Sequence, residues 1–182
     1  MSLRLPMRAL VLASFLAVLG RIGAAQDWLD ATAAHVPQAQ QAWGKDVHGE
    51  ALFICRAQYA ATGRDPGWHL GKFRKPFNGC HISYGGAEVE IPNFQVLSNT
   101  VLIRGWMQYV DGQPNDGTIH DYLGGGQEGK ADGGQPLYVC RSTIQDANGI
   151  QLGKFRPEFK GCQYPFGGNE VRVGVYELAL IK

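Results

Sequence analysis

The chain has no dense cluster of basic residues and, after residue 25, no apolar run of membrane length. Its 182 residues include 17 Lys or Arg and 16 Asp or Glu, which gives a formal net charge of +1. Proteins that bind nucleic acid or anionic membranes concentrate Lys and Arg on one surface. The composition therefore predicts no nucleic-acid partner and no insertion into a membrane.

Residues 1–25 have the pattern of a secretory signal peptide. Arg4 and Arg8 precede an apolar run at residues 9–19, and small residues occupy positions 23–25, as signal peptidase requires. The run is too short for a spanning helix, which disfavours a membrane anchor. We expect cleavage after Ala25 and a secreted or periplasmic protein. The remaining 157 residues carry 14 basic and 16 acidic side chains, a net charge of −2.

One segment of the chain occurs twice, at a constant offset of 82 residues. The first copy, residues 70–88, contains LGKFR, GC and YGG and ends at Glu88; the second, residues 152–170, contains LGKFR, GC and FGG and ends at Glu170. A fixed period of this size marks duplicated structural units. We expect a first repeat at residues 26–100 and a second repeat at residues 101–182, which together form one compact unit.

The apolar pattern favours strands in both repeats. Cys80, Ile82 and Tyr84 alternate with polar residues, and residues 162–166 alternate in the same way. The apolar run at residues 51–57 is typical of a strand buried on both faces. A helical period of 3.6 residues is weakly present at residues 38–42 and not convincing elsewhere. The sequence therefore predicts an all-β fold.

The four cysteines lack the spacing of a metal site. None forms a Cys-x-x-Cys pair, and no His stands at ligand spacing in both repeats, so zinc is disfavoured. In an exported chain, four cysteines favour two disulfides. The strand pattern directs both cysteines of a repeat inward, which favours Cys55–Cys80 and Cys140–Cys162. Pairing between the repeats stays open at this point.

The ordered motifs of the two repeats resemble the DM-nine repeat. Those that carry the resemblance are Trp28, Pro37, Gly44-x-Asp46, the strand LFICRA at residues 52–57, Gly71-Lys72, Gly79-Cys80, Tyr84-Gly85-Gly86-x-Glu88 and Phe94-x-Val96-Leu97. In two copies they cover nearly all of residues 28–180. Tandem DM-nine repeats form small lectins in invertebrates and the lectin part of natterin-like toxins.

The resemblance implies an antiparallel β fold, a strand-exchanged sandwich or prism-like arrangement with pseudo-twofold symmetry, and mannose binding. The sugar contacts of the family lie on the Asp after Gly-x and on the Lys after Gly, which here are Asp46 and Lys72. The second repeat keeps Lys154. Counting back from its strand places Ala131 opposite Asp46, with Asp132 one residue further along. We expect one full site and a second, altered site at Lys154 and Asp132.

The residue types suit a sugar on chemical grounds. A carboxylate accepts hydrogen bonds from vicinal hydroxyls, and an ammonium donates to their oxygens. The alternative for Lys72 and Lys154 is a solvated lysine on a turn. We expect Glu88 and Glu170 to have a supporting role, either as acceptors for the amides of the glycine turns or as support for the lysines. No metal or cofactor is required.

Two other functions remain open from the sequence. A disulfide-stabilised structural or protein-interaction module fits the same export signal and fold. A glycan-hydrolysing enzyme would use Glu88 and Glu170 as its paired carboxylates. Equivalent positions in two repeats poorly supply the two different environments that such a pair needs. We therefore predict a non-enzymatic, lectin-like protein that binds mannose-type glycans as a monomer or a homodimer.

Overall fold

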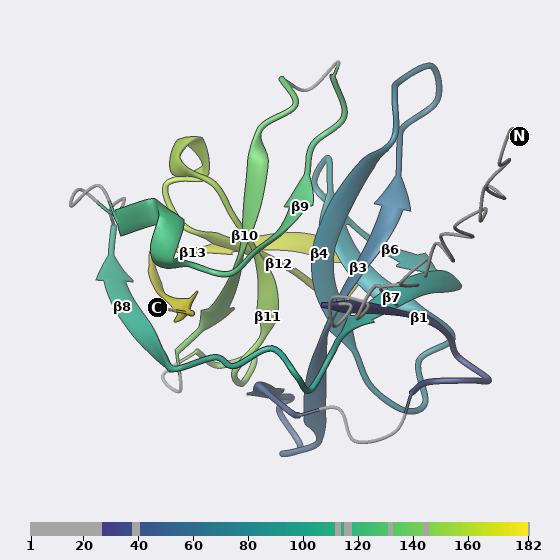
Figure 1. The fold of residues 1–182 in the computed structure, drawn as a ribbon, viewed down its shortest axis with the longest axis horizontal. Helices are drawn as coiled ribbons and strands as arrows, with labels where there is room; N and C mark the ends of the chain where they lie inside the picture. Colours follow the sequence, from purple (N-terminus) through teal and green to yellow (C-terminus); the bar gives the residue numbers. More distant parts are fainter. Residues whose placement is uncertain are drawn as a thin grey trace, which may run out of the picture.

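The structure, a computed structural model, describes residues 27–37, 41–111, 114, 118–130, 133–143 and 146–181. These residues form β-strands joined by loops, with two short 3₁₀ helices at Thr118–Asp121 and Pro157–Phe159 (Figure 1). The predicted all-β fold is confirmed. The expected signal peptide and Asp132 lie outside the described residues.

Each repeat supplies seven strands. Those of the first repeat are β1 (Trp28–Thr32), β2 (Gly44–Lys45), β3 (Ala51–Tyr59), β4 (Gly67–Phe73), β5 (Cys80–Tyr84), β6 (Ala87–Ile91) and β7 (Asn93–Leu97). Those of the second are β8 (Gly105–Val110), β9 (Gly124–Gln127), β10 (Pro136–Ser142), β11 (Leu152–Phe155), β12 (Cys162–Phe166), β13 (Asn169–Val173) and β14 (Val175–Leu180).

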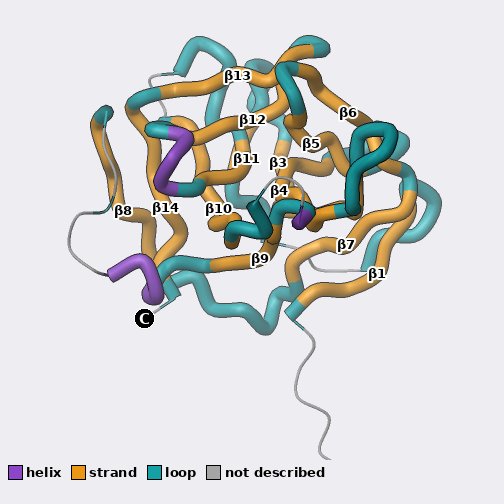
Figure 2. Tube along the Cα trace, turned by 90° about the horizontal axis from the view of Figure 1, so that it is seen from above, coloured by secondary structure: helices purple, strands orange, loops and turns teal. Residues whose placement is uncertain are grey.

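The strands pair antiparallel in the order β1-β7-β3-β4-β5-β6-β13-β12-β11-β10-β14-β8. The first repeat occupies one half of this path and the second repeat the other, and they meet where β6 pairs with β13 (Figure 2). Two short strands lie off the path: β2 pairs with β3 and contacts Ile150, while β9 pairs with β10 and β4. Strand exchange and a pseudo-twofold axis stay predictions.

The glycine pairs of the two repeats form tight turns between neighbouring strands. Gly85 and Gly86, between β5 and β6, have φ of +60° and +89°, and Gly167 and Gly168, between β12 and β13, have φ of +60° and +83°. Two successive residues with positive φ characterise the two-residue hairpin turn that favours glycine. The turns therefore need glycine for their backbone conformation.

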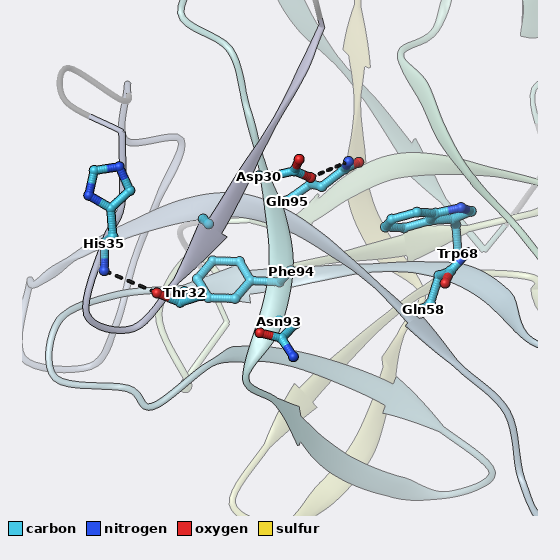
Figure 3. Close-up of a pocket in the computed structure, with 9 residues that line it drawn as sticks. Asp30, Thr32, His35, Gln58, Trp68, Asn93, Phe94 and Gln95 are labelled. Carbon is cyan, nitrogen blue, oxygen red and sulfur yellow. Dashed lines mark hydrogen bonds between the residues drawn. The ribbon is translucent and has the colours of Figure 1, made fainter.

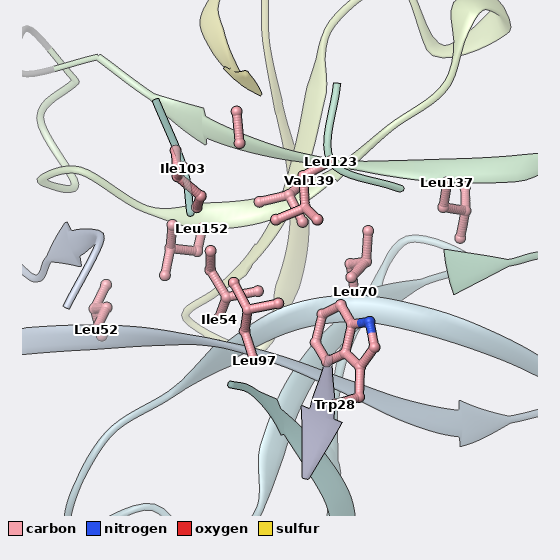
Figure 4. Packing of buried hydrophobic residues seen from close by; sticks show 11 residues of the cluster. Trp28, Leu52, Ile54, Leu70, Leu97, Ile103, Leu123, Leu137, Val139 and Leu152 are labelled. Carbon is pink, nitrogen blue, oxygen red and sulfur yellow. The ribbon is translucent and has the colours of Figure 1, made fainter. Parts of the chain in front are cut away.

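Three buried clusters stabilise the fold, and one of them joins the repeats. The joining cluster contains Trp28, Leu52, Ile54, Leu70 and Leu97 from the first repeat, and Ile103, Leu123, Leu137, Val139, Leu152 and Ala179 from the second (Figure 4). Each of the other two clusters surrounds one disulfide, Cys55–Cys80 or Cys140–Cys162. These are the pairings within a repeat that the sequence favours.

Two arginines also connect the repeats. Arg56 on β3 donates from Nη1 to the carbonyl oxygen of Gly125 at 2.8 Å, and Arg141 on β10 donates to that of Trp43 at 3.1 Å. Gly125 lies within the short strand β9, and Trp43 immediately precedes the short strand β2. Because leaving a partly buried guanidinium unpaired is costly, these bonds hold β9 and the start of β2 in place from the opposite repeat.

Candidate functional site

A pocket of about 240 Å³ contains three of the residues singled out from the sequence: Asp46, Lys72 and Glu88. Its remaining lining is Val47, His48, Leu52, Arg74, Phe77, His81, Gln151, Phe166 and Gly167. We call it the first pocket. Although its lysine lies on β4, part of its wall comes from the second repeat, including the start of the β12–β13 turn. The first pocket is therefore a composite of both repeats.

Lys72 is a buried lysine, with 4% of its surface exposed. Its Nζ donates to Oε1 of Gln151 at 2.6 Å and lies 5.2 Å from the ring centroid of Phe166. Burial lowers the pKa of Lys72 to about 8, although the charges of Glu88 and Asp46 act in the opposite direction. The alternative of a solvated lysine on a turn is therefore wrong for Lys72.

The position of Lys72 depends on the glycine before it in the chain. Gly71 pairs with Ile82 on β5, and a Cβ atom at Gly71 would collide with the carbonyl oxygen of His81. Gly153, which precedes Lys154, has the same relation to the carbonyl oxygen of Gln163. The glycine of each Gly-Lys pair thus allows the close approach of two strands.

Asp46 follows β2 and is oriented by its own loop. Its Oδ1 accepts hydrogen bonds from the backbone N–H groups of His48 and Glu50, both at 2.9 Å. Its Oδ2 lies 3.5 Å from Nη1 of Arg74, which also pairs with Glu50. These contacts fix the carboxylate while leaving it part of the pocket lining.

Glu88 links the first pocket to the turn of the second repeat. Its Oε2 accepts from the backbone N–H of Gly168 at 2.8 Å, and its Oε1 lies 2.7 Å from Nδ1 of His81. Burial alone would raise the pKa of Glu88, but the bonds from His81 and Gly168 and the charge of Lys72 lower it. Glu88 accepts from the backbone of a glycine turn that belongs to the other repeat, and its supporting role stays a prediction.

A second pocket of about 370 Å³ surrounds Lys154. It is lined by Ala61, Arg64, Tyr84, Gly85, Glu128, Lys154, Arg156, Phe159, Gln163 and Glu170. Lys154 is 3% exposed, and its Nζ lies 3.7 Å from Oε2 of Glu170 and 5.7 Å from the ring centroid of Tyr84. Burial lowers the pKa of Lys154, against the opposing charges of Glu170 and Glu128. This lysine too is not a solvated turn residue.

Glu128 holds the place in the second repeat that Asp46 holds in the first. Gly126 pairs with Leu137 as Gly44 pairs with Leu52, and the acidic residue follows two positions after each glycine. Glu128 also pairs with Arg156, as Asp46 does with Arg74. Ala131 therefore does not occupy the counterpart position, and Asp132 as a ligand stays a prediction.

The register explains why the sequence argument missed Glu128. Lys45 pairs with Ala51, but Gln127 pairs with Pro136, so the connection after β9 is longer by three residues. Counting back from β10 by the distance found in the first repeat therefore stops three residues short of Glu128. A signal was present in the sequence, because the Gly-x-acid motif recurs at the same offset of 82 residues as the Gly-Lys motif.

The two glutamates of the repeated motif line two different pockets in the described part of the chain. Glu88 lies in the first pocket and Glu170 in the second. The backbone N–H of Glu170 bonds to the carbonyl oxygen of Gly86, and that of Glu88 to Gly168. A glycosidase needs two carboxyl groups on either side of one scissile bond. The placement of Glu88 and Glu170 in different pockets therefore does not support the hypothesis that pairs them.

The alternation at residues 80–84 and 162–166 places Tyr84 and Phe166 on the same face of their strands as Cys80 and Cys162, which predicts contacts within their own repeats. Both are half-buried, and each instead lines the pocket that holds the lysine of the other repeat. The alternation of β5 and β12 correctly assigns the face of the strand. It does not indicate that these last residues, next to the glycine turns, reach across to the other repeat.

No group of three or more His, Cys, Asp or Glu in the described part of the chain could hold a metal ion. Within the same ranges, no helix is long and apolar enough to cross a membrane.

Comparison with known families identifies the repeat. Residues 64–173 match the sequence model of the DM9 repeat, and this match spans more than half of the chain. It includes both Gly-Lys motifs and both glycine turns of the pockets described above. No curated protein matches the sequence. The chain belongs to the DM9 repeat family.

Proposed function

We propose that the protein is a lectin that binds mannose-type sugars and that Asp46 and Lys72 are its principal contacts. The observation that carries the proposal is a buried lysine beside a fixed carboxylate in a small pocket. Burying a charged amine is costly, so its retention in a pocket favours a role in binding.

The groups of the first pocket complement the hydroxyls of a hexose. The ammonium of Lys72 would donate to sugar oxygens, and the carboxylate of Asp46 would accept from adjacent hydroxyls. Phe77 and Phe166 add apolar surface to the lining, which suits the C–H groups of a sugar ring. No metal or cofactor is part of this mode of binding.

The second pocket is proposed as an altered sugar site at Lys154. Glu128 would take the role of Asp46, and its longer side chain accompanies a larger pocket, about 370 Å³ against 240 Å³. Arg64 and Gln163 line this pocket, whereas His48 and Gln151 are among the polar residues that line the first pocket. We therefore propose that the two pockets differ in sugar preference, and that the exported protein presents both.

The test is a glycan array followed by titration calorimetry with mannose-type oligosaccharides. Asp46→Ala and Lys72→Ala should each lower affinity at the first pocket by at least about tenfold, the loss of one good charged hydrogen bond. Lys45→Ala is the matched control, because Lys45 is an exposed lysine next to Asp46. Absence of sugar binding, or binding that neither change affects, would refute the proposal and favour a structural or protein-interaction module.

A further inference from the structure

A third concave site lies away from both lysine pockets, on the face of β1, β7, β3 and β4 (Figure 3). This groove has a volume of about 440 Å³ and is lined by Asp30, Ala31, Thr32, His35, Gln58, Trp68, Asn93, Phe94 and Gln95. It shares no lining residue with the pockets of Lys72 and Lys154. Its size is within the usual range for small-ligand sites.

The charge of the groove excludes an anionic ligand. Among the described residues that line the groove, Asp30 is the one carboxylate and none is Lys or Arg. Asp30 accepts a hydrogen bond from Nε2 of Gln95 at 2.8 Å. The nearby guanidinium of Arg56 is engaged by Gln95 and by the carbonyl oxygen of Gly125. A phosphate or carboxylate would meet Asp30 with no free cation to balance it. The exposed carboxamides of Gln58 and Asn93 favour a neutral, polar ligand.

Trp68 gives the groove a fixed aromatic surface. The guanidinium of Arg56 lies 4.6 Å from the ring centroid of Trp68 and 4.5 Å from that of Trp28, so it is held between two indoles. Trp68 is half-buried and lines the groove, beside Gln58, which is its partner across the strand pair. An aromatic face next to carboxamides and a carboxylate suits a saccharide, which presents C–H groups on one side and hydroxyls at its rim.

The second repeat shows that the fold does not require this composition. By the offsets of the shared motifs, Thr143, Ile150 and Val175 stand where the first repeat has Gln58, Trp68 and Asn93. Arg141, the counterpart of Arg56, is stacked at 4.0 Å on Trp106, with Ile150 in place of a second indole. The strands and the arginine link therefore form without Trp68 and its polar neighbours.

We infer that this groove is a binding site for a neutral saccharide. One sugar ring packs on Trp68, and its hydroxyls bond to Gln58, Asn93 and the carboxylate of Asp30. The inference does not depend on the lysine pockets, and it adds a third point of attachment to a protein already proposed to bind glycans. Several weak sites on one chain would increase avidity for a multivalent glycan.

The test uses the full chain with Lys72→Ala and Lys154→Ala, which remove the lysines of the other two pockets. The probes are mannotriose, laminaripentaose, chitotriose and, as an anionic reference, sialyllactose, each titrated by calorimetry. At least one neutral probe should bind, and sialyllactose should bind more weakly. Adding Gln58→Thr, Trp68→Ile and Asn93→Val gives the groove the residues of the second repeat and should lower affinity at least tenfold. If the background with Lys72→Ala and Lys154→Ala loses mannose binding relative to the parent protein, that loss tests the proposed function of the lysine pockets. It does not test the groove.

Three outcomes would overturn the inference: no neutral probe binds, the three changes leave affinity unaltered, or sialyllactose binds best. Thermal unfolding shows whether the groove variant is folded. If it is not, Gln58→Ala with Asn93→Ala replaces it, because both side chains are exposed and Trp68 stays in place. A loss of binding in that folded variant supports the site, and unchanged affinity contradicts it.

Discussion

Raising the pH from about 7 to about 9.5 should stabilise the fold through Lys72 while weakening sugar binding at the first pocket. Burial lowers the pKa of Lys72 from 10.5 to about 8. A pKa lowered by this much means that the charged form of Lys72 destabilises the folded protein by about 3 kcal/mol at neutral pH. The reason is that the folded state must bury the charge. Between pH 8 and 10.5 the unfolded state binds more protons than the folded state, so the free energy of unfolding rises with pH.

Sugar binding should change in the opposite direction, because the proposed donor is the ammonium. With a pKa of about 8, Lys72 is mostly charged at neutral pH and about one-tenth charged near pH 9, so affinity should fall about tenfold. The measurement is calorimetric titration with mannotriose at pH 7 and at pH 9 in a Lys154→Ala background, which isolates the first pocket. Lys72→Arg is the control, since arginine stays charged throughout this range.

The stability half of the prediction is tested with Lys72→Met, which keeps the length of the side chain without its charge. Urea unfolding should show the variant to be more stable than the parent at pH 7, with a difference that shrinks toward pH 10. Asp46 and Glu88 lose a neighbouring cation in the variant, so the gain should be smaller than about 3 kcal/mol. A variant that is less stable at pH 7, or a difference that does not change with pH, would refute the reasoning.

Three further predictions follow from the pockets and the core. Glu128→Ala should abolish sugar binding at the second pocket, whereas Asp132→Ala should leave that binding intact. Both variants are measured by titration in a Lys72→Ala background. The reverse result would assign the ligand role to Asp132. Glu88→Gln keeps the side-chain shape but weakens the acceptor for the Gly168 amide, so thermal unfolding should show a loss of about 1–2 kcal/mol. Replacing Cys55 and Cys80 together by Ala removes the disulfide that closes a loop of 25 residues. The free energy of unfolding, measured with urea, should fall by about 3 kcal/mol, and a fall of less than about 1 kcal/mol would contradict this.

The local parts of the fold could be predicted because they depend on short-range pattern. Residues 80–84 alternate along the sequence and form β5, and the glycine pairs occupy turns with positive φ. The cysteine pairing followed from the faces of the same strands. In each case the physical cause lies within a few residues, namely the two-residue period of a strand and the steric demand of a turn.

The composition of the pockets could not be predicted, because it depends on contacts between the repeats. Nothing in the alternation of β12 shows that Phe166 lies over Lys72, or that Gly168 donates to Glu88. Gln151, the acceptor for Lys72, carries no sequence signal, since a glutamine before the Leu-Gly-Lys motif has no counterpart glutamine in the first repeat. The sequence pattern singled out Lys72, but it did not indicate which residues contact Lys72.

The composite walls give a physical reason for the duplication. The turn of each repeat closes the pocket of the other: Gly167 and Phe166 line the first pocket, and Gly85 and Tyr84 line the second. A single repeat would leave its lysine without this cover, so the ammonium would be solvated and its pKa would approach an ordinary value. The burial that lowers the pKa of Lys72, and with it the expected pH dependence of binding, is therefore a property of the repeat pair. The differences between the walls, such as Phe166 against Tyr84, then allow one duplicated motif to hold two unlike sites.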